Sequence, residues 1–441
     1  MLANNTQEKP PNNGNSTGPI APTIPDDRSG SPADDDFPVH RKLEHCPFTR
    51  FTKSYEFGFD EMSNFTFMEL MEARTNLNLA LSGTIYIASA PKEQEHDILV
   101  TVAYATTSLW RVTSPHFIMD REGLDLQFPN IDKEGSMNNK EPSCMDISVA
   151  IQVRAGVELG DWFIGTANLD VETVKPEYDT GSSEYLQPMR LANSSSINTM
   201  HGHVDLSYWN SRHTVVETIS GSIHGEYALR DLLVVKSQSG AITISVDPKD
   251  EDTDRPAPAD FTARSTSGSV HVAFPTSGEI PAREYRTRVE TQSSAIGGSY
   301  ILGLMSSFTT VSGSITTKLL PYDATEPLSS LRTESRSGAT IIEVLEPYRN
   351  ASKPMSALHS YHRTSAGSGA INVKYPQQWT GTIDAETLTG SIALQGKDVK
   401  VDMDSHYRPM VRHVIAHKGH GDSRLDLRSS SGGVIVRVGD E

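Results

Sequence analysis

The sequence predicts an all-β protein, a right-handed parallel β-helix or β-solenoid-like repeat that follows a disordered N-terminal tail. Three observations predict this class. A short phrase of a hydroxyl residue, glycine, a small residue and alternating apolar residues recurs along the chain. β-branched residues dominate the apolar runs, as is typical of strands. The first 45 residues are rich in Pro, Asn, Gly, Ser and Asp and poor in residues that build a core.

The first segment, residues 1–45, is expected to be a disordered tail or stalk. Its composition offers little apolar surface, so burial cannot offset the entropy that ordering would cost. Apolar residues become frequent only after Cys46.

The second segment, residues 46–165, is expected to form a β-rich N-terminal part or cap of the solenoid. The runs Thr84–Ile87, Ile98–Val102 and Ile147–Val153 are bounded by polar turn residues, as strands are. The stretch Phe65–Ala73 fits a short helix or a strand. Alternation of Phe65 and Phe67 with polar neighbours favours the strand.

The third segment, residues 166–441, is expected to form a repetitive β-solenoid domain, and it holds nine of the ten copies of the phrase. The copies are Ser82-Gly83-Thr84-Ile85, Ser220-Gly221-Ser222-Ile223, Ser239-Gly240-Ala241-Ile242, Ser267-Gly268-Ser269-Val270, Ser312-Gly313-Ser314-Ile315, Ser337-Gly338-Ala339-Thr340, Ser368-Gly369-Ala370-Ile371, Thr380-Gly381-Thr382-Ile383, Thr389-Gly390-Ser391-Ile392 and Ser431-Gly432-Gly433-Val434. From Gly221 onward most copies follow one another at about 10 to 30 residues, near the range that signals a stacked repeat.

Each copy is interpreted as one corner and one strand of a coil. Glycine supplies the turn, flanking Ser and Thr stack on the next coil, and alternate apolar residues point inward. The expected inward side chains include Ile242, Ile244, Ile371, Val373, Ile392 and Leu394. Loops of unequal length, such as Asp247–Asp260, explain the uneven spacing. Ordinary hairpin turns in a β-sandwich or propeller remain compatible with the pattern.

The series of phrases, which ends with Leu425–Val436, resembles the family of adhesin-like domains of unknown function found in bacteria and fungi. The resemblance covers about residue 168 to the C-terminus. It implies a right-handed β-solenoid-like fold with no defined reaction, in a fungal-type surface protein.

Charge and hydropathy limit the partners. Lys and Arg total 39 against 56 Asp and Glu, a formal charge of −17, which repels nucleic acid and anionic lipid. No apolar run reaches the roughly 18 residues of a membrane span, and the start lacks the pattern of a signal peptide. We therefore expect no nucleic-acid partner and no membrane span in this chain.

The cysteines and glycosylation acceptors bear on the compartment. Cys46 and Cys144 are the only thiols and either form a disulfide or stay as two buried thiols. A bridge would close a loop of about 100 residues, which is worth about 4.7 kcal/mol in the chain-entropy model. The acceptor triplets at Asn64, Asn193 and Asn350, with two more at Asn4 and Asn15, favour the secretory route and a glycoprotein.

No catalytic, cofactor-binding or metal-binding residue is predicted, and no cofactor. The acidic run Asp250–Asp254 lacks the glycine and the distal glutamate of a calcium loop. The series His413, His417 and His420 is expected on a strand with diverging faces, not on a zinc site. Ser368 lacks the Gly-x-Ser-x-Gly spacing of a nucleophile elbow and is interpreted as a turn residue.

The sequence thus predicts a non-enzymatic surface or extracellular protein with an adhesin-like binding or structural role, whose partner is a cell-wall polysaccharide or a surface protein. Two alternatives stay open. One is a β-helix lyase or hydrolase acting on polysaccharide, which requires paired carboxylates on adjacent coils. The other is an intracellular scaffold in the cytoplasm.

Overall fold

The computed structural model describes residues 51–71, 79–91, 93–106, 115–128, 143–174, 190–324, 329–366, 369–408 and 411–439. Every regular element in these ranges is a strand, so the predicted all-β class is confirmed. The stretch Asn64–Met71 is a strand, as the Phe alternation indicated. None of the residues described forms a helix long and apolar enough to cross a membrane.

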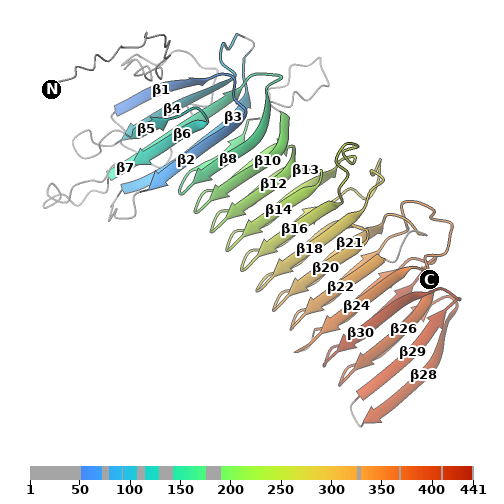
Figure 1. Ribbon diagram of the computed structural model, residues 1–441. Coiled ribbons are helices and arrows are strands. Elements are labelled where there is room, and N and C mark those ends of the chain that lie inside the picture. The colour runs from blue at the N-terminus through green and yellow to red at the C-terminus, as the bar shows by residue number, and fades with distance from the viewer. Residues whose placement is uncertain are drawn as a thin grey trace, which may run out of the picture.

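The strands form two long sheets, which Figure 1 shows running the length of an elongated molecule. Sheet A contains, in spatial order, β1 (Phe51–Phe59), β4 (Ile98–Thr106), β7 (Ser143–Val153), β3 (Leu79–Ser89), β9 (Asp170–Thr173), β11 (Val204–Trp209), β13 (Ile223–Leu229), β15 (Ile242–Pro248), β17 (Val270–Ala273), β19 (Ile296–Leu302), β21 (Ile315–Pro321), β23 (Thr340–Val344), β25 (Ile371–Tyr375), β31 (Val434–Val438) and β27 (Ile392–Gly396).

Sheet B contains β28 (Val399–Arg408), β29 (Val411–Lys418), β26 (Gly381–Thr387), β30 (Ser423–Ser429), β24 (Leu358–Thr364), β22 (Ser329–Ser335), β20 (Met305–Thr310), β18 (Tyr285–Thr291), β16 (Ala259–Ser265), β14 (Leu232–Ser237), β12 (Ser211–Thr218), β10 (Arg190–Thr199), β8 (Glu158–Thr166), β2 (Asn64–Met71), β6 (Gly123–Phe128) and β5 (His116–Met119). From β8 to β25 consecutive strands alternate between the sheets. Each turn of the chain therefore adds one parallel strand to each sheet, which makes a two-sheeted coil.

The core lies between the sheets and follows the period of two expected of strands. Along β15, β16 and β24 buried and solvent-facing residues alternate. Five of the six predicted inward residues of the repeat are buried, from Ile242 to Ile392. Leu394 is only partly buried, because it lies on β27, the last strand of sheet A.

The spatial order of coils departs from the chain order at both ends. The last coil, β30 and β31, lies between the coil of β24 and β25 and the coil of β26 and β27. The coil of β2 and β3 likewise lies between that of β6 and β7 and that of β8 and β9. Both terminal coils are therefore paired on two sides.

Two of the ten predicted corners lie elsewhere in the structure. Ser82 and Gly83 lie inside β3, where both neighbouring strands, β7 and β9, run parallel to it. Gly381 begins β26, at the opposite edge of the coil. Both phrases have the residue types of a corner. At a true corner, however, a strand of sheet B ends just before the phrase, and neither phrase follows such a strand end.

Candidate functional site

The chain crosses between the two sheets at two edges of the coil, and the connections at these edges differ in length. Equivalent corner residues of neighbouring short coils are 19 residues apart, as in His201 and Ser220 or Thr291 and Thr310. Longer coils add their extra residues where the chain passes from sheet A to sheet B, including 249–258, 275–284 and 345–357. We call this the loop edge, and the opposite one, from sheet B to sheet A, the tight edge. Figure 1 shows the loops projecting along one side of the array.

The tight edge is built around a buried hydroxyl three residues before most of its glycines, although Gly369 has Ala366 at that position. Thr218 Oγ1 donates to the carbonyl of Gly221 at 2.6 Å, and the Gly268 N–H donates to Ser265 Oγ at 2.9 Å. The hydroxyls also reach between coils, since Thr291 Oγ1 donates to Thr310 Oγ1 at 2.9 Å. This buried row satisfies polar groups that the sharp corner would otherwise bury without partners.

Sequence reasoning identified the glycines and the serines beside them but missed this hydroxyl row. The signal was present as Ser or Thr three positions before the glycine, in Thr218, Ser237, Ser265, Thr310, Ser335, Thr387 and Ser429. Among the predicted serines of the described corners, Ser220, Ser239, Ser267, Ser312, Ser337 and Ser431 are exposed. Ser220 and Ser239 continue the ladder around the corner by their backbone N–H groups, at 2.9 Å from the carbonyls of Met200 and Ile219.

Close approach between coils explains the corner glycines. A Cβ on Gly240 would lie 1.9 Å from the carbonyl oxygen of Gly221, and one on Gly268 would lie 1.9 Å from that of Gly240. Both distances are far below any allowed contact. The tight edge is therefore uniform because few substitutions fit it.

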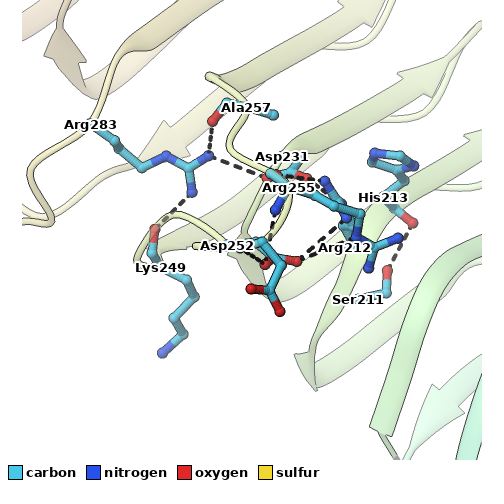
Figure 2. A network of polar contacts seen from close by, with 10 residues as sticks. Ser211, Arg212, His213, Asp231, Lys249, Asp252, Arg255, Ala257 and Arg283 are labelled. Atoms are coloured by element: carbon cyan, nitrogen blue, oxygen red, sulfur yellow. Dashed lines mark hydrogen bonds and ion pairs between the residues drawn. The ribbon is translucent and has the colours of Figure 1, made fainter.

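The loop edge contains a buried network of charged residues, shown in Figure 2. Asp231, in the turn between β13 and β14, accepts hydrogen bonds from Arg212 Nε and, at 3.3 Å, from Arg283 Nη2. The Asp231 and Arg283 side chains are 5% and 0% exposed. Such burial is tolerated only where charges are paired and hydrogen-bonded.

The same two arginines hold the loop 249–258 by its main chain. Arg283 Nη1 donates to the carbonyl of Lys249 at 2.9 Å and Nη2 to that of Ala257 at 2.6 Å. Arg212 Nη2 donates to the carbonyl of Arg255 at 2.8 Å. The loop is thus fixed at its beginning and at its end, while Glu251, Thr253 and Asp254 are exposed at its tip.

Within the acidic run, Asp252 is bound by groups of the protein itself. Its Oδ1 accepts the backbone N–H of Asp254 at 3.0 Å, and Arg212 Nη1 lies 3.4 Å from its Oδ2. The N–H of Asp254, together with the nearby Arg212 and Arg255, lowers the pKa of Asp252. Across the described ranges, no group of three or more His, Cys, Asp or Glu side chains could hold a metal ion.

Tyrosines link the next loops along the same edge. The rings of Tyr285 and Tyr322 lie 5.9 Å apart between centroids, and those of Tyr322 and Tyr348 also lie 5.9 Å apart. Tyr348 Oη accepts the N–H of Ile280 at 3.2 Å, which joins the loops 275–284 and 345–357. The loop edge is therefore a packed surface made by several coils.

The histidine series lies on the C-terminal hairpin and its members bind separate aspartates. His413 Nε2 lies 2.9 Å from Asp384 Oδ1, and His417 Nδ1 lies 2.7 Å from Asp402 Oδ2. The expected divergence of faces was wrong for these two, because residues four apart on β29 share a face. At about 3.3 Å per residue they are nevertheless about 13 Å apart along the strand, too far for one metal ion. His420 lies in the turn after β29.

The remaining sequence candidates are placed as follows. Cys144 is buried on β7 and Cys46 lies outside the described residues, so the bridge stays a prediction. Asn193 is exposed in the bulge of β10, whereas Asn64 Oδ1 accepts the N–H of Asp161 at 3.0 Å. Asn350 Nδ2 donates to both carboxylate oxygens of Asp323 at 2.9 Å. Their glycosylation stays a prediction. Ser368, like Asn4 and Asn15, falls outside the described ranges.

Comparison with known proteins gives little. No family model matches the chain, and no curated protein matches it. A solved structure that resembles it is the crystal structure of a "putative cell adhesion protein" from Clostridium sporogenes, with 5% identity and a TM-score of 0.15 over 88% of this chain and 100% of that one. A TM-score this low does not establish a shared fold. The resemblance to the adhesin-like family therefore stays a prediction.

Proposed function

We propose that this chain is a non-enzymatic binding protein of the cell surface or extracellular space, with the loop edge as its binding surface. The observation that carries the proposal is the asymmetry between the two edges. The tight edge is uniform, while several coils add their extra residues at the loop edge. In stacked repeats, insertions gather on one face that is often the binding face, and a rigid scaffold bearing loops is a common design for recognition.

The hydrogen bonds from Arg212 and Arg283 to the main chain of loop 249–258 support this assignment. Fixing the main chain of 249–258 at both ends reduces the entropy that the loop would lose on binding a partner. The ligand class proposed is a cell-wall polysaccharide or a surface protein.

The experiment is co-sedimentation of the purified protein with insoluble chitin, cellulose and β-glucan, followed by a glycan array. The loop variant carries Glu251→Ala, Thr253→Ala and Asp254→Ala, all at exposed positions. The matched control carries Gln238→Ala and Gln292→Ala, two exposed residues of the tight edge. We expect at least a tenfold loss of binding in the loop variant alone.

Results of three kinds would overturn or narrow the proposal. Equal loss in both variants, or loss in the control alone, would move the binding surface away from the loop edge. Binding by neither the wild-type protein nor any variant to these polymers or the array would remove the polysaccharide class and leave surface proteins to be tested in the same way. Release of reducing ends or unsaturated sugars from a polymer would establish the enzyme alternative.

A further inference from the structure

At each end of the array, one sheet extends by more strands beyond the last complete coil than the other sheet does. At the C-terminal end, sheet A stops at β27, while sheet B continues beyond β26 with β29 and β28. At the N-terminal end, sheet A continues beyond β7 with β4 and β1, while sheet B continues beyond β6 with β5 alone. Sheet B therefore overhangs at one end and sheet A at the other, and Figure 1 shows these ends far apart.

Both terminal strands of sheet B leave an inward apolar side chain uncovered. Val401 on β28 is paired with Ala416, which is fully buried, yet Val401 is 56% exposed. Met119 on β5 is paired with Leu124, which is 1% exposed, yet Met119 is 39% exposed. Directly paired residues point to the same side of a sheet, so both side chains face the core layer and are exposed because the array ends there.

The charges of the C-terminal edge strand that flank Val401 lie on the other face of the sheet. Lys400 is paired with His417, and Asp402 lies 2.7 Å from His417 Nδ1. Such charges usually protect an edge strand from pairing with another chain. Here Lys400 and Asp402 occupy the outer face beside the inward Val401, while Asp404, farther along β28, is paired with buried Val414 and binds Arg412.

The strand directions allow sheet B to continue into a second copy. β1 is antiparallel to β4, and β4 is antiparallel to β7. β1 therefore runs parallel to the strands of the repeat in sheet A, as β27 does. A second copy placed behind the C-terminal end would bring its β5 against β28 in antiparallel orientation, as β5 already meets β6, and so continue sheet B. Sheet B then has three strands between the two coils, β29, β28 and β5, and sheet A has two, β4 and β1. In sheet A the parallel strands β1 and β27 are therefore separated by one strand position. Among the residues described, no strand pairs with the outer sides of β1, β5, β27 or β28.

We propose that copies of this chain associate head to tail, the N-terminal end of one against the C-terminal end of the next. The contact is heterologous, so each copy keeps one free end and the assembly grows as an open line. Met119 of one copy and Val401 of the next would be covered at the junction. The proposal does not depend on which ligand the loop edge binds.

The experiment is sedimentation velocity of the full chain over a hundredfold range of concentration, with three kinds of variant. Val401→Lys alters the C-terminal end and Met119→Lys the N-terminal end. The controls are Val311→Lys and Met305→Lys, which place the same charge at exposed apolar residues in the middle of the array, 44% and 46% exposed. Circular dichroism and the melting temperature confirm that each variant folds.

The wild-type protein and both controls should form a concentration-dependent series of linear oligomers, and each end variant alone should be at least tenfold weaker in association. An equimolar mixture of the two end variants should form dimers and nothing larger, because each retains one functional end. A monomeric wild-type protein at every concentration, end variants that associate like the controls, or a mixture that forms no dimers would overturn the proposal.

Discussion

The Oε2 atom of Glu69 lies 2.8 Å from the backbone nitrogen of Ala167 and accepts a hydrogen bond from it. The same oxygen accepts the N–H of Asn168 at 3.0 Å, and Oε1 accepts the Asn168 side-chain amide at 3.1 Å. In later coils the corner N–H groups bond to a carbonyl of the preceding corner, as that of Ser220 bonds to Met200. Glu69, 5% exposed, supplies the acceptor at the start of this ladder.

Replacing Glu69 should therefore destabilise the N-terminal part of the array. Glu69→Ala leaves the buried N–H groups of Ala167 and Asn168 without acceptors, at a cost of about 1 to 3 kcal/mol. Glu69→Gln keeps one acceptor oxygen and should lose less. Urea unfolding measures both, with Glu251→Gln at the exposed loop tip as control, and an unchanged midpoint for Glu69→Ala would refute the role given to this carboxylate.

Neighbouring glycines in the last corner provide a matched pair. A Cβ on Gly432 would lie 2.0 Å from the carbonyl oxygen of Gly369, whereas one on Gly433 would meet nothing closer than 3.4 Å, at Ser391 Oγ. Gly432→Ala should lower the unfolding free energy by about 2 kcal/mol or more, as overpacking does. Gly433→Ala should change it little. Equal effects in thermal unfolding would show that coil spacing does not select these glycines.

Buried His362 should make stability depend on pH. Its Nδ1 lies 2.8 Å from Thr333 Oγ1 and its Nε2 3.1 Å from Tyr375 Oη, and burial lowers its pKa from 6.5 to about 3. The unfolded chain takes up this proton below about pH 6.5, while the folded chain takes it up only near pH 3. The contribution of His362 to stability is thus fully present above pH 6.5 and is lost as the pH falls towards 3, at about 1.4 kcal/mol per pH unit.

Unfolding free energies of wild type and His362→Gln, measured from pH 7 to pH 4, isolate this contribution. Asp384 and Asp404 have pKa values held below 3.8, the first mainly by Arg428 against the opposing effect of burial, the second by Arg412, so they should titrate below this window. The slope in the wild type should exceed that in the variant. Parallel curves would mean that His362 is protonated in the folded protein.

The inserted last coil predicts the effect of a C-terminal deletion. β26 and β27 pair with β30 and β31 and have no pairing with β24 or β25. Removing residues 422–441 should therefore release everything from β26 to β29, about twice the length deleted. Limited proteolysis should cut the shortened chain soon after Tyr375 and leave the preceding coils intact. Continued protection of β26 would show that it can stack directly on β24.

The sequence predicted the strands and most tight corners because each depends on neighbouring residues, as Ser239 and Gly240 do. It could not predict the insertion of β30 and β31, since a strand pattern does not specify which coil it joins. The ion pair of Arg283 with Asp231 could not be predicted either, because 52 residues separate the two in the sequence. Ser82 and Gly83 imitated a corner because the phrase is short. Ala80 stands three positions before Gly83, where most corners have a buried hydroxyl.

The loop edge as the binding surface is the central claim, and hydrogen exchange with and without bound wall polysaccharide tests it most directly. The wild-type protein is saturated with the polymer found by co-sedimentation, and protection is compared segment by segment. We predict slowed exchange in 249–258, 275–284 and 345–357, with none added at the tight corners around Ser220, Ser239 and Ser312. Protection confined to those corners, or equal protection at both edges, would contradict the account.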